Sequence, residues 1–337
     1  KQFLSGNRLN WIKREEQYLS NKGIDLKYII QAMDKFVLQL DPPAHTHLRK
    51  FILDNWKNKD VEKLIQKNID IALASIHSGS VNIHKQLTSK LPSMNATAIL
   101  GLPPSDYEML HQLASKMIIA LDLYVSLQEL VTLNEAARGF MSYFQNLIQN
   151  KKYSDGLLAN LIEANAVSEA PLNTQELTSL AIFIFVAGEE TSVSFTSTGL
   201  YHILDKGLKS DINKIDDFNI VVEELLRYDP PVQDAIIGGE KIKKGDTLTL
   251  AIAAANRDPT VFEKPNDIIF DRTEKRHLAF GQGIHYCLGD WLAKISAKMA
   301  FQNCIQRFPD LELSKEKPEW NKNLAIRSLK TLWVEIN

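Results

Sequence analysis

The stretch from Asn173 to Leu204 is the longest helical segment of the sequence, and it limits the possible folds more than any other feature. Asn173 and Glu176 have the spacing of a helix-capping box. About 31 residues at a rise of 1.5 Å each predict a helix of roughly 46 Å. Its surface is apolar except at one short interruption, which is typical of a central helix.

Helical periodicity also dominates the rest of the chain. Three further helices are expected, at Asp60–His77, Pro104–Leu121 and Ser126–Gln149. Strand-like alternation is sparse and occurs at Thr247–Ala253 and Thr331–Ile336. The pairs Gly238-Gly239 and Gly245-Asp246 are typical of turns that flank a short hairpin. Because neither a linker nor a charge block divides the chain, we expect one mainly α domain over residues 1–337 with small β-sheets.

The composition is that of an ordinary globular protein, with 337 residues, 45% of them hydrophobic, and a formal net charge of −2. This charge gives no reason to expect a nucleic-acid partner. Cys287 and Cys304 are the two cysteines, so a disulfide framework is not expected and a reducing cytosol is the default compartment. Cys304 fits the apolar pattern of a helix and is interpreted as packing. No window reaches the length of a membrane span and no signal-peptide pattern begins the chain, so we expect a cytoplasmic protein.

A cysteine lies in a glycine-containing loop, Phe280–Gly289. Gly281 and Gly283 allow the backbone to take positive φ and to approach a flat partner closely. Cys287 falls near the start of an apolar helical run, where free N–H groups and the helix dipole favour a thiolate. A thiolate held in such a loop suits an axial ligand of haem iron. The alternative is a cysteine that is merely packed as a small hydrophobic side chain.

This ten-residue pattern resembles the haem-binding signature of the cytochrome P-450 (haem-thiolate monooxygenase) family, soluble prokaryotic type. The resemblance implies a mainly α fold with small β-sheets, in which the haem lies between a long central helix and the cysteine loop and helix. It implies haem b (heme, iron protoporphyrin IX) as cofactor, with Cys287 as the metal ligand. The cofactor-binding residues that it implies in this stretch are Phe280, Gly281, His285, Cys287 and Gly289.

A second candidate segment follows Pro42 and Pro43, after which a helix can begin at Ala44. His45 and Arg49 are four residues apart and share one face of that helix. A cationic pair can clamp a carboxylate, and the alternative is a solvated basic face. The segment resembles the family's early helix, whose His and Arg bind the haem propionates.

The interruption in the long helix is Ala187–Thr191, a small residue and a glycine followed by two acids and an alcohol. On structural grounds alone, Gly188 would be a packing glycine beside two exposed glutamates. The segment resembles the family's oxygen-activation motif, in which Glu190 and Thr191 match the acid–alcohol pair that manages protons. Glu189 is then expected to turn away. The catalytic residues implied are Thr191, Glu190, Gly188 and Ala187.

Glu224 and Arg227 lie three residues apart on one helix face, a spacing that by itself indicates an ordinary surface pair. They resemble the family's buried Glu–Arg pair, which is joined by a second Arg from the segment before the cysteine loop. Arg272 fits that position, and we interpret the three as a structural network. His277 is expected to brace the loop through hydrogen bonds.

Together the motifs predict a haem-thiolate monooxygenase that inserts one oxygen atom from dioxygen into a small lipophilic substrate, apolar or amphipathic. No flavin or dinucleotide fingerprint occurs, so a separate ferredoxin-like or flavin protein would donate the electrons. Its docking face is expected to include Lys294 and Lys298. Two alternatives remain open, a peroxide-driven haem-thiolate peroxygenase and a non-catalytic haem-based sensor or carrier.

Two departures from the family pattern also emerge from the sequence. The N-terminal part is shorter than is usual in the family. The family commonly has an Arg for a haem propionate after the position of Val232, whereas Gln233–Ile237 contains none.

Overall fold

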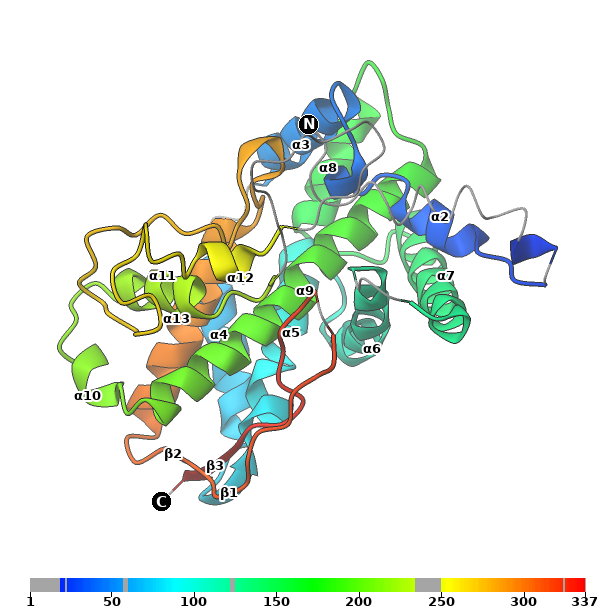
Figure 1. Ribbon diagram of the computed structural model, residues 1–337. Helices are drawn as coiled ribbons and strands as arrows, with labels where there is room; N and C mark the ends of the chain where they lie inside the picture. Colours follow the sequence, from blue (N-terminus) through cyan, green and yellow to red (C-terminus); the bar gives the residue numbers. More distant parts are fainter. Residues whose placement is uncertain are drawn as a thin grey trace. The chain divides into compact units, whose positions relative to one another are not determined.

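The computed structural model describes residues 19–21, 23–56, 60–121, 125–233, 250–323 and 325–336 (Figure 1). They form a mainly α-helical protein with small β elements, so the predicted fold class is confirmed. The chain separates into two compact units, each built from two stretches of sequence. Unit 1 comprises Lys1–Val61 and Ser93–Glu190, and unit 2 comprises Glu62–Pro92 and Thr191–Asn337. That residues 1–337 act as one domain stays a prediction.

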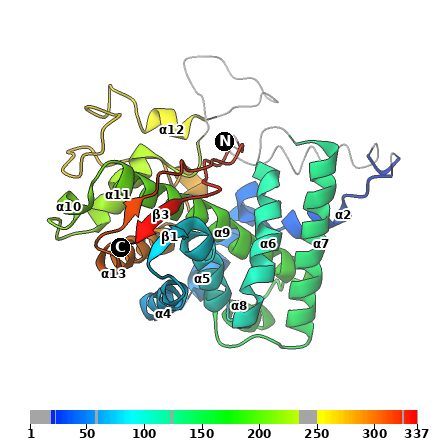
Figure 2. The ribbon, with the colours of Figure 1, turned by 90° about the horizontal axis from the view of Figure 1, so that it is seen from below.

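The elements of unit 1, within its described part, are helices joined by turns and loops. Its elements are α2 (Lys27–Met33), the 3-10 helix η1 (Val37–Gln39), α3 (Ala44–Asn55), most of α5 (Leu91–Leu100), the 3-10 helix η3 (Pro104–Asp106), α6 (Tyr107–Met117), the 3-10 helix η4 (Ile118–Leu121), α7 (Leu127–Gln149), α8 (Leu157–Ala166) and the first part of α9 (Thr174–Asp205). Helices α6 and α7 run side by side (Figure 2). The Tyr143 hydroxyl of α7 donates to Asp106 at the start of α6 at 2.9 Å.

The predicted helices of unit 1 begin where the sequence supplies a start signal. At α7, the Ser126 hydroxyl accepts from the Glu129 backbone N–H, and the Glu129 carboxylate accepts from the Ser126 N–H. This capping box satisfies two N–H groups that have no partner inside the helix. Helix α3 begins at Ala44, directly after the two prolines, as predicted. The stretch Pro104–Leu121 is helical as expected, although its two ends are 3-10 turns.

Helix α9 confirms the long helix expected from the sequence. Asn173 and Glu176 exchange hydrogen bonds of 3.0 Å in both directions, each backbone N–H donating to the other side chain. The division between the two units falls between Glu190 and Thr191, within this helix. No segment as long as a membrane span is expected from the sequence. By its length and composition, α9 could nevertheless cross a membrane. In the described structure, however, 61% of its most apolar window is buried, as in the core helix of a globular protein.

Unit 2 combines helices with one small sheet. Its elements are α4 (Val61–Ala74), β1 (Gly79–Asn82), the π-helical turn η2 (His84–Thr88), the rest of α9, α10 (Lys209–Ile212), α11 (Asn219–Tyr228), α12 (Ile252–Ala255), the 3-10 helix η5 (Gly283–His285), α13 (Asp290–Arg307), β2 (Glu312–Leu313) and β3 (Trp333–Ile336). The antiparallel strands have the order β1-β3-β2, with Gly79 opposite Ile336 and Glu312 opposite Glu335. Helices α11 and α13 pack against each other. The predicted strand near the C-terminus is confirmed as β3.

The strand predicted at Thr247–Ala253 is wrong at its C-terminal end. Residues Ile252–Ala255 form α12, since a run of alanines favours helix over strand. Residues 247–249 lie outside the described residues, as do the expected turns at Gly238-Gly239 and Gly245-Asp246.

Candidate functional site

The cysteine loop has the backbone conformation that its glycines predict. Gly281 has φ +71° and Gly283 has φ +78°, the left-handed region that side chains other than glycine rarely adopt. The Cys287 N–H donates to the Phe280 carbonyl at 3.0 Å and closes the loop. Helix α13 begins at Asp290, three residues later. Cys287 is half-buried and forms no disulfide.

Large apolar side chains are exposed along this loop. Leu278, Ile284, Tyr286 and Trp291, in the loop and directly beside it, are each 38–45% exposed, and exposed apolar side chains that gather in one place mark a binding surface. A Cβ placed on Gly283 or Gly289 would meet nothing within 4 Å, so the backbone there is open to close approach. A thiol in a loop with exposed apolar side chains and open glycines fits a flat, largely apolar group such as a porphyrin.

The loop is braced from α11. His277 accepts from the Ala279 N–H at Nδ1 and contacts Glu223 Oε2 through Nε2 at 2.7 Å. Lys294 of α13 lies 2.9 Å from Glu223 Oε1 and 5.1 Å from the centre of the Phe280 ring. Burial alone would raise the pKa of Glu223, but the hydrogen bonds from His277 and Lys294 outweigh it and bring this pKa to about 2. The Glu223 carboxylate therefore stays ionised and ties the loop to two helices.

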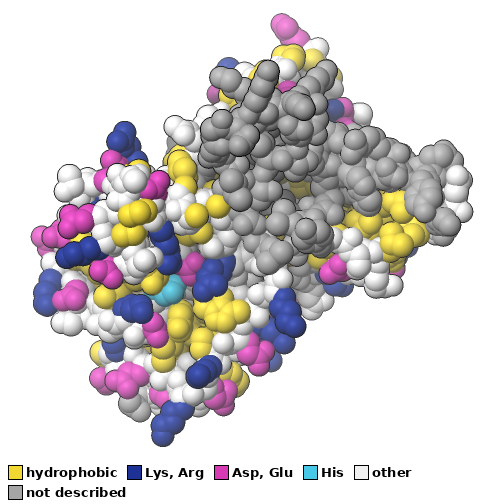
Figure 3. All heavy atoms as spheres, viewed as in Figure 1, with side chains coloured by type: hydrophobic (Ala, Val, Ile, Leu, Met, Phe, Trp, Pro, Cys, Tyr) yellow, Lys and Arg dark blue, Asp and Glu magenta, His cyan; other side chains and the backbone are white. Residues whose placement is uncertain are grey.

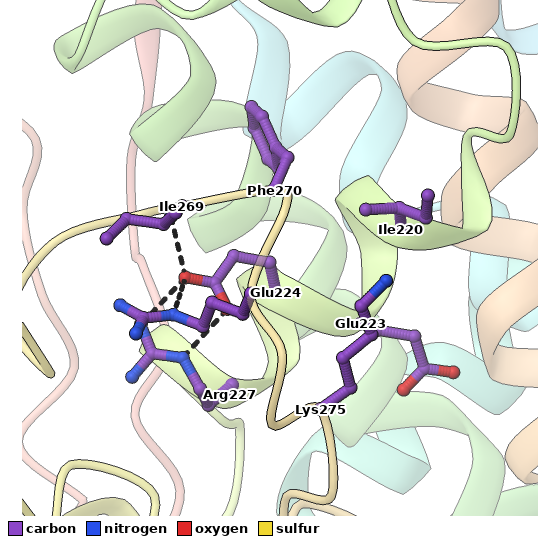
Figure 4. Close-up of a pocket in the computed structure, with 8 residues that line it drawn as sticks. Ile220, Glu223, Glu224, Arg227, Ile269, Phe270 and Lys275 are labelled. Carbon is purple, nitrogen blue, oxygen red and sulfur yellow. Dashed lines mark hydrogen bonds and ion pairs between the residues drawn. The ribbon is translucent and has the colours of Figure 1, made fainter. Parts of the chain in front are cut away.

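The structure brings Glu224, Arg227 and Arg272 together. Figure 4 shows Glu224 and Arg227 side by side, with Ile269 next to them. Arg227 forms a bidentate pair with Glu224, with both N–O distances 2.8 Å, and Arg272 Nε donates to Glu224 Oε1 at 2.9 Å. The Ile269 N–H donates to the same oxygen at 2.8 Å. The remaining guanidinium N–H groups donate to backbone carbonyls, those of Asn256, Glu263, Lys264, Pro265 and Asp267.

All three side chains of this network are almost fully buried. A cavity of about 10 Å³ beside the network is lined by Glu223, Glu224 and Arg227 among others, and it is too small for more than one water molecule. The network thus has the donors, acceptors and enclosure of a structural element, with no room for a substrate.

His45 and Arg49 lie on the same side of α3 in unit 1. His45 is buried and Arg49 is half-buried, and Leu48 and Ile52 complete the buried side of this helix. His285 and Cys287 belong to unit 2. Of the segment without the expected Arg, Gln233 is described, and its backbone N–H donates to the Ala325 carbonyl at 3.1 Å. The residues that follow it, up to Ile237, lie outside the described residues.

The interruption in α9 separates its two acids. Ala187 and Gly188 are exposed, and a Cβ on Gly188 would meet nothing within 4 Å. Glu190 and Thr191 are half-buried, whereas Glu189 is fully buried. Successive helical residues are about 100° apart, so Glu189 lies on nearly the opposite side of α9 from Thr191. Glu189 and Thr191 therefore project from different sides of α9, and the roles of the two acids stay a prediction.

Sequence reasoning missed two residues that hold Glu189. The Ser93 hydroxyl of α5 donates to Glu189 Oε1 at 2.8 Å, and His111 Nδ1 of α6 lies 2.5 Å from the same oxygen. They are 96 and 78 residues from Glu189 along the chain, so no local spacing connects them.

A second missed cluster lies in unit 2. His202 Nε2 of α9 lies 2.8 Å from Asp229 Oδ2, and Arg327 Nε lies 3.0 Å from Asp229 Oδ1. Burial alone would raise the pKa of Asp229, but the hydrogen bond to His202 and the charge of Arg327 lower it. This ionised carboxylate connects the end of α11 with α9 and with the C-terminal segment.

Comparison with known proteins gives consistent results. A family model described as Cytochrome P450 matches residues 209–332. The polyketide biosynthesis cytochrome P450 PksS of Bacillus subtilis (strain 168) is 30% identical, and the match covers 99% of this chain and 86% of that protein. The cytochrome P450 monooxygenase PikC of Streptomyces venezuelae is 31% identical over 89% of this chain and 76% of its own length. The crystal structure of P450BioI in complex with hexadec-9Z-enoic acid ligated acyl carrier protein matches with a TM-score of 0.81 and 26% identity, over 92% of this chain and 84% of that one.

Proposed function

The chain belongs to the cytochrome P450 family, and from this premise we propose which of its residues carry out the family's reaction. It is a haem b monooxygenase that transfers one atom of dioxygen to an organic substrate with electrons from a redox partner. The haem iron, when bound, activates dioxygen, and a thiolate ligand favours cleavage of the O–O bond. The proposal concerns the side chains that hold this group and manage protons beside it.

The proposed iron ligand is the thiolate of Cys287. The observation that carries this assignment is the loop itself, where two left-handed glycines and the Cys287–Phe280 hydrogen bond present a half-buried sulfur beside exposed apolar side chains. The other cysteine is unsuited to ligation. Cys304 is buried, and burial raises the pKa of its thiol to about 12, so that it stays protonated.

The proposed proton-handling residues are Glu190 and Thr191. A carboxylate and a hydroxyl on neighbouring positions of α9 can accept, hold and donate protons in sequence. Ala187 and Gly188 precede them without bulky side chains and leave the helix surface open. The cationic side chain proposed for the propionates is that of Arg49, together with His45 and His285, which carry a positive charge when protonated. Phe280 would offer apolar surface to the porphyrin, and Gly281 and Gly289, which lack side chains, would allow its close approach.

The proposed substrate is apolar or amphipathic. Support comes from the relatives, since one is named for polyketide biosynthesis and another is seen with a fatty acid on an acyl carrier protein. We further propose a single monooxygenase domain in the cytoplasm and a separate ferredoxin-like or flavin protein as electron donor.

The proposed docking surface for the donor centres on Lys298. Lys294 was the other candidate, but it is engaged with Glu223 and lies 3.6 Å from Asp290, so it braces the cysteine loop. On the face of unit 2 that carries α10–α12, basic and acidic side chains are interspersed (Figure 3). The face that carries α10–α12 would therefore attract a charged partner less strongly than a surface with charges of one sign would.

The optical spectrum of the reduced, CO-treated holoprotein tests the ligand. We expect the wild type and Cys304→Ala to show the red-shifted band of thiolate-ligated haem, and Cys287→Ser to lose it. Haem content, measured in each sample, distinguishes a lost ligand from a lost cofactor. A thiolate band that survives in Cys287→Ser would overturn the assignment.

A further inference from the structure

The buried carboxylate of Glu189 is held by two side chains from other helices of unit 1. Its Oε1 accepts from the Ser93 hydroxyl of α5 and contacts His111 Nδ1 of α6. Its Oε2 is also buried and has no hydrogen-bond partner among the described residues. An isolated buried carboxylate is unstable unless it is paired or protonated, so this group depends on its histidine.

His111 spans the distance from the surface to this buried acid. The His111 side chain is 30% exposed, whereas that of Glu189 is inaccessible to solvent. One imidazole nitrogen is engaged by the carboxylate, and the ring has a second nitrogen that can exchange protons. A partly exposed histidine bonded to a fully buried carboxylate is the arrangement of a proton entry point.

The charges around His111 favour its protonated form. The hydrogen bond to Glu189 raises the pKa of His111, burial opposes this, and the negative charges of Glu189, Glu190 and Glu108 raise it further. From α5 the only contact described is the neutral Ser93 hydroxyl, through Glu189. From α7, the titratable Tyr143 donates its hydroxyl hydrogen bond to Asp106 and not to His111. Glu190 thus lies within electrostatic reach of the histidine.

The phase of α9 places Glu190 between Glu189 and Thr191. Each step along the helix turns by about 100°, so Glu190 is about 100° from each of its neighbours, which are about 200° from each other. Around the helix, Glu190 is therefore the ionisable group that lies between the side of Glu189 and the side of the alcohol.

We propose that the pair His111–Glu189 is a proton-entry device that supplies Glu190. His111 takes a proton from bulk water at its exposed edge, and a proton passes from the pair to the Glu190 carboxylate. The imidazole is then reprotonated from solvent. The net transfer is one proton from water to Glu190, with no change in oxidation state. The inference rests on the proposed role of Glu190, and His111 and Glu189 act through it as positioning residues.

The first test needs no turnover. The chain has 8 histidines, so a holoprotein labelled with ¹³C and ¹⁵N at histidine gives a resolvable NMR titration. We expect the His111 resonance, assigned by its loss in His111→Gln, to titrate above the ordinary range of histidine. In Glu189→Gln its pKa should fall by about 1 unit or more, because the hydrogen-bonded charge is gone. An unchanged pKa in Glu189→Gln would show that the two groups are not coupled and would overturn the proposal.

The second test compares two ways of driving the enzyme. In His111→Gln, product formation from dioxygen and a reductase system should slow about 10-fold, less than the ~10²–10⁴ that a direct general acid contributes. The solvent deuterium isotope effect should rise, and more of the reducing equivalents should appear as hydrogen peroxide. Turnover driven by added hydrogen peroxide, which brings its own protons and both oxygen atoms, should fall by less than twofold.

The matched control is His77→Gln, since His77 is exposed and belongs to unit 2. It should match the wild type in both reactions. If His111→Gln lowers thermal stability but leaves the isotope effect and the yield of peroxide unchanged, the pair is structural and the proposal fails. If the reduced CO spectrum of the wild type itself lacks the thiolate band, the fault lies with the proposed iron ligand and not with His111.

Discussion

At the scale of single residues, the buried carboxylates of Glu189, Glu224 and Asp229 are each hydrogen-bonded to at least one other side chain. Glu224 receives hydrogen bonds from Arg227, Arg272 and the backbone of Ile269, and the two guanidinium groups use their other N–H groups on carbonyls. Such a cluster is not a large source of stability when complete. Its importance appears when one member is removed, because the others cannot be rehydrated.

Glu224→Gln is therefore expected to destabilise the protein by about 3–5 kcal/mol, since two buried guanidinium charges lose their counter-ion. The measurement is urea unfolding of the holoprotein followed by far-UV circular dichroism. The control is Asp211→Asn, which removes an exposed pair with Lys214 and should change the free energy of unfolding by less than about 1 kcal/mol. Equal effects of the two substitutions would contradict the structural role of the network.

At the scale of elements, a glycine in α9 leaves room for an aromatic side chain of a neighbouring helix of unit 2. Gly199 of α9 faces Phe301 of α13, and a Cβ at this position would lie 2.4 Å from the Phe301 Cζ atom. Phe301 is itself buried and packs edge-on against Phe195, with ring centres 5.9 Å apart. Because protein interiors are close-packed, a buried ring of this kind has little room to move away from an added atom.

Gly199→Ala should thus destabilise unit 2 by about 1–3 kcal/mol, although alanine is intrinsically the better helix former. A matched control is Gly139→Ala in α7, where the new Cβ would lie 2.8 Å from the tip of Leu113, a side chain that can change rotamer. We expect that substitution to cost less than about 1 kcal/mol. The check is a double-mutant cycle by thermal unfolding, in which Phe301→Leu should relieve Gly199→Ala. Strict additivity of the two changes would refute the close contact.

The elements also show what the sequence can predict. Long helices with start signals were found from one stretch of sequence, because capping and apolar spacing are local. The strand predicted at Thr247–Ala253 overlaps the short helix Ile252–Ala255, since a helix of four residues carries too little periodicity to separate it from a strand. The contact between Glu189 and His111 could not be predicted from the sequence. His111 lies on another helix, and only the packing of α6 beside α9 brings the two together.

At the scale of the whole molecule, a net charge of −2 conceals carboxylates that the fold holds ionised well below their ordinary range. Asp229 has a lowered pKa, as does Glu223, which reaches about 2. Each is more acidic in the native state than an ordinary carboxyl group, so the unfolded chain binds protons first as the pH falls. The native state is therefore expected to lose stability progressively in acid.

The contribution of Glu223 is present in full above pH ~4.5, the ordinary value for a glutamate, and is lost between there and a pH of about 2. Because its side chain is 30% exposed, solvent screening limits this contribution to about 1–2 kcal/mol. Glu223→Gln should lower the free energy of unfolding at pH 6 and flatten its decline between pH 5 and pH ~3, as measured by urea unfolding at each pH. The exposed Glu319→Gln, whose partner Lys330 is 3.4 Å away, should leave the slope unchanged. If Glu223→Gln and the wild type declined in parallel, the acid sensitivity would have to arise at Asp229 or elsewhere, and the brace between α11 and the cysteine loop would not depend on an ionised Glu223.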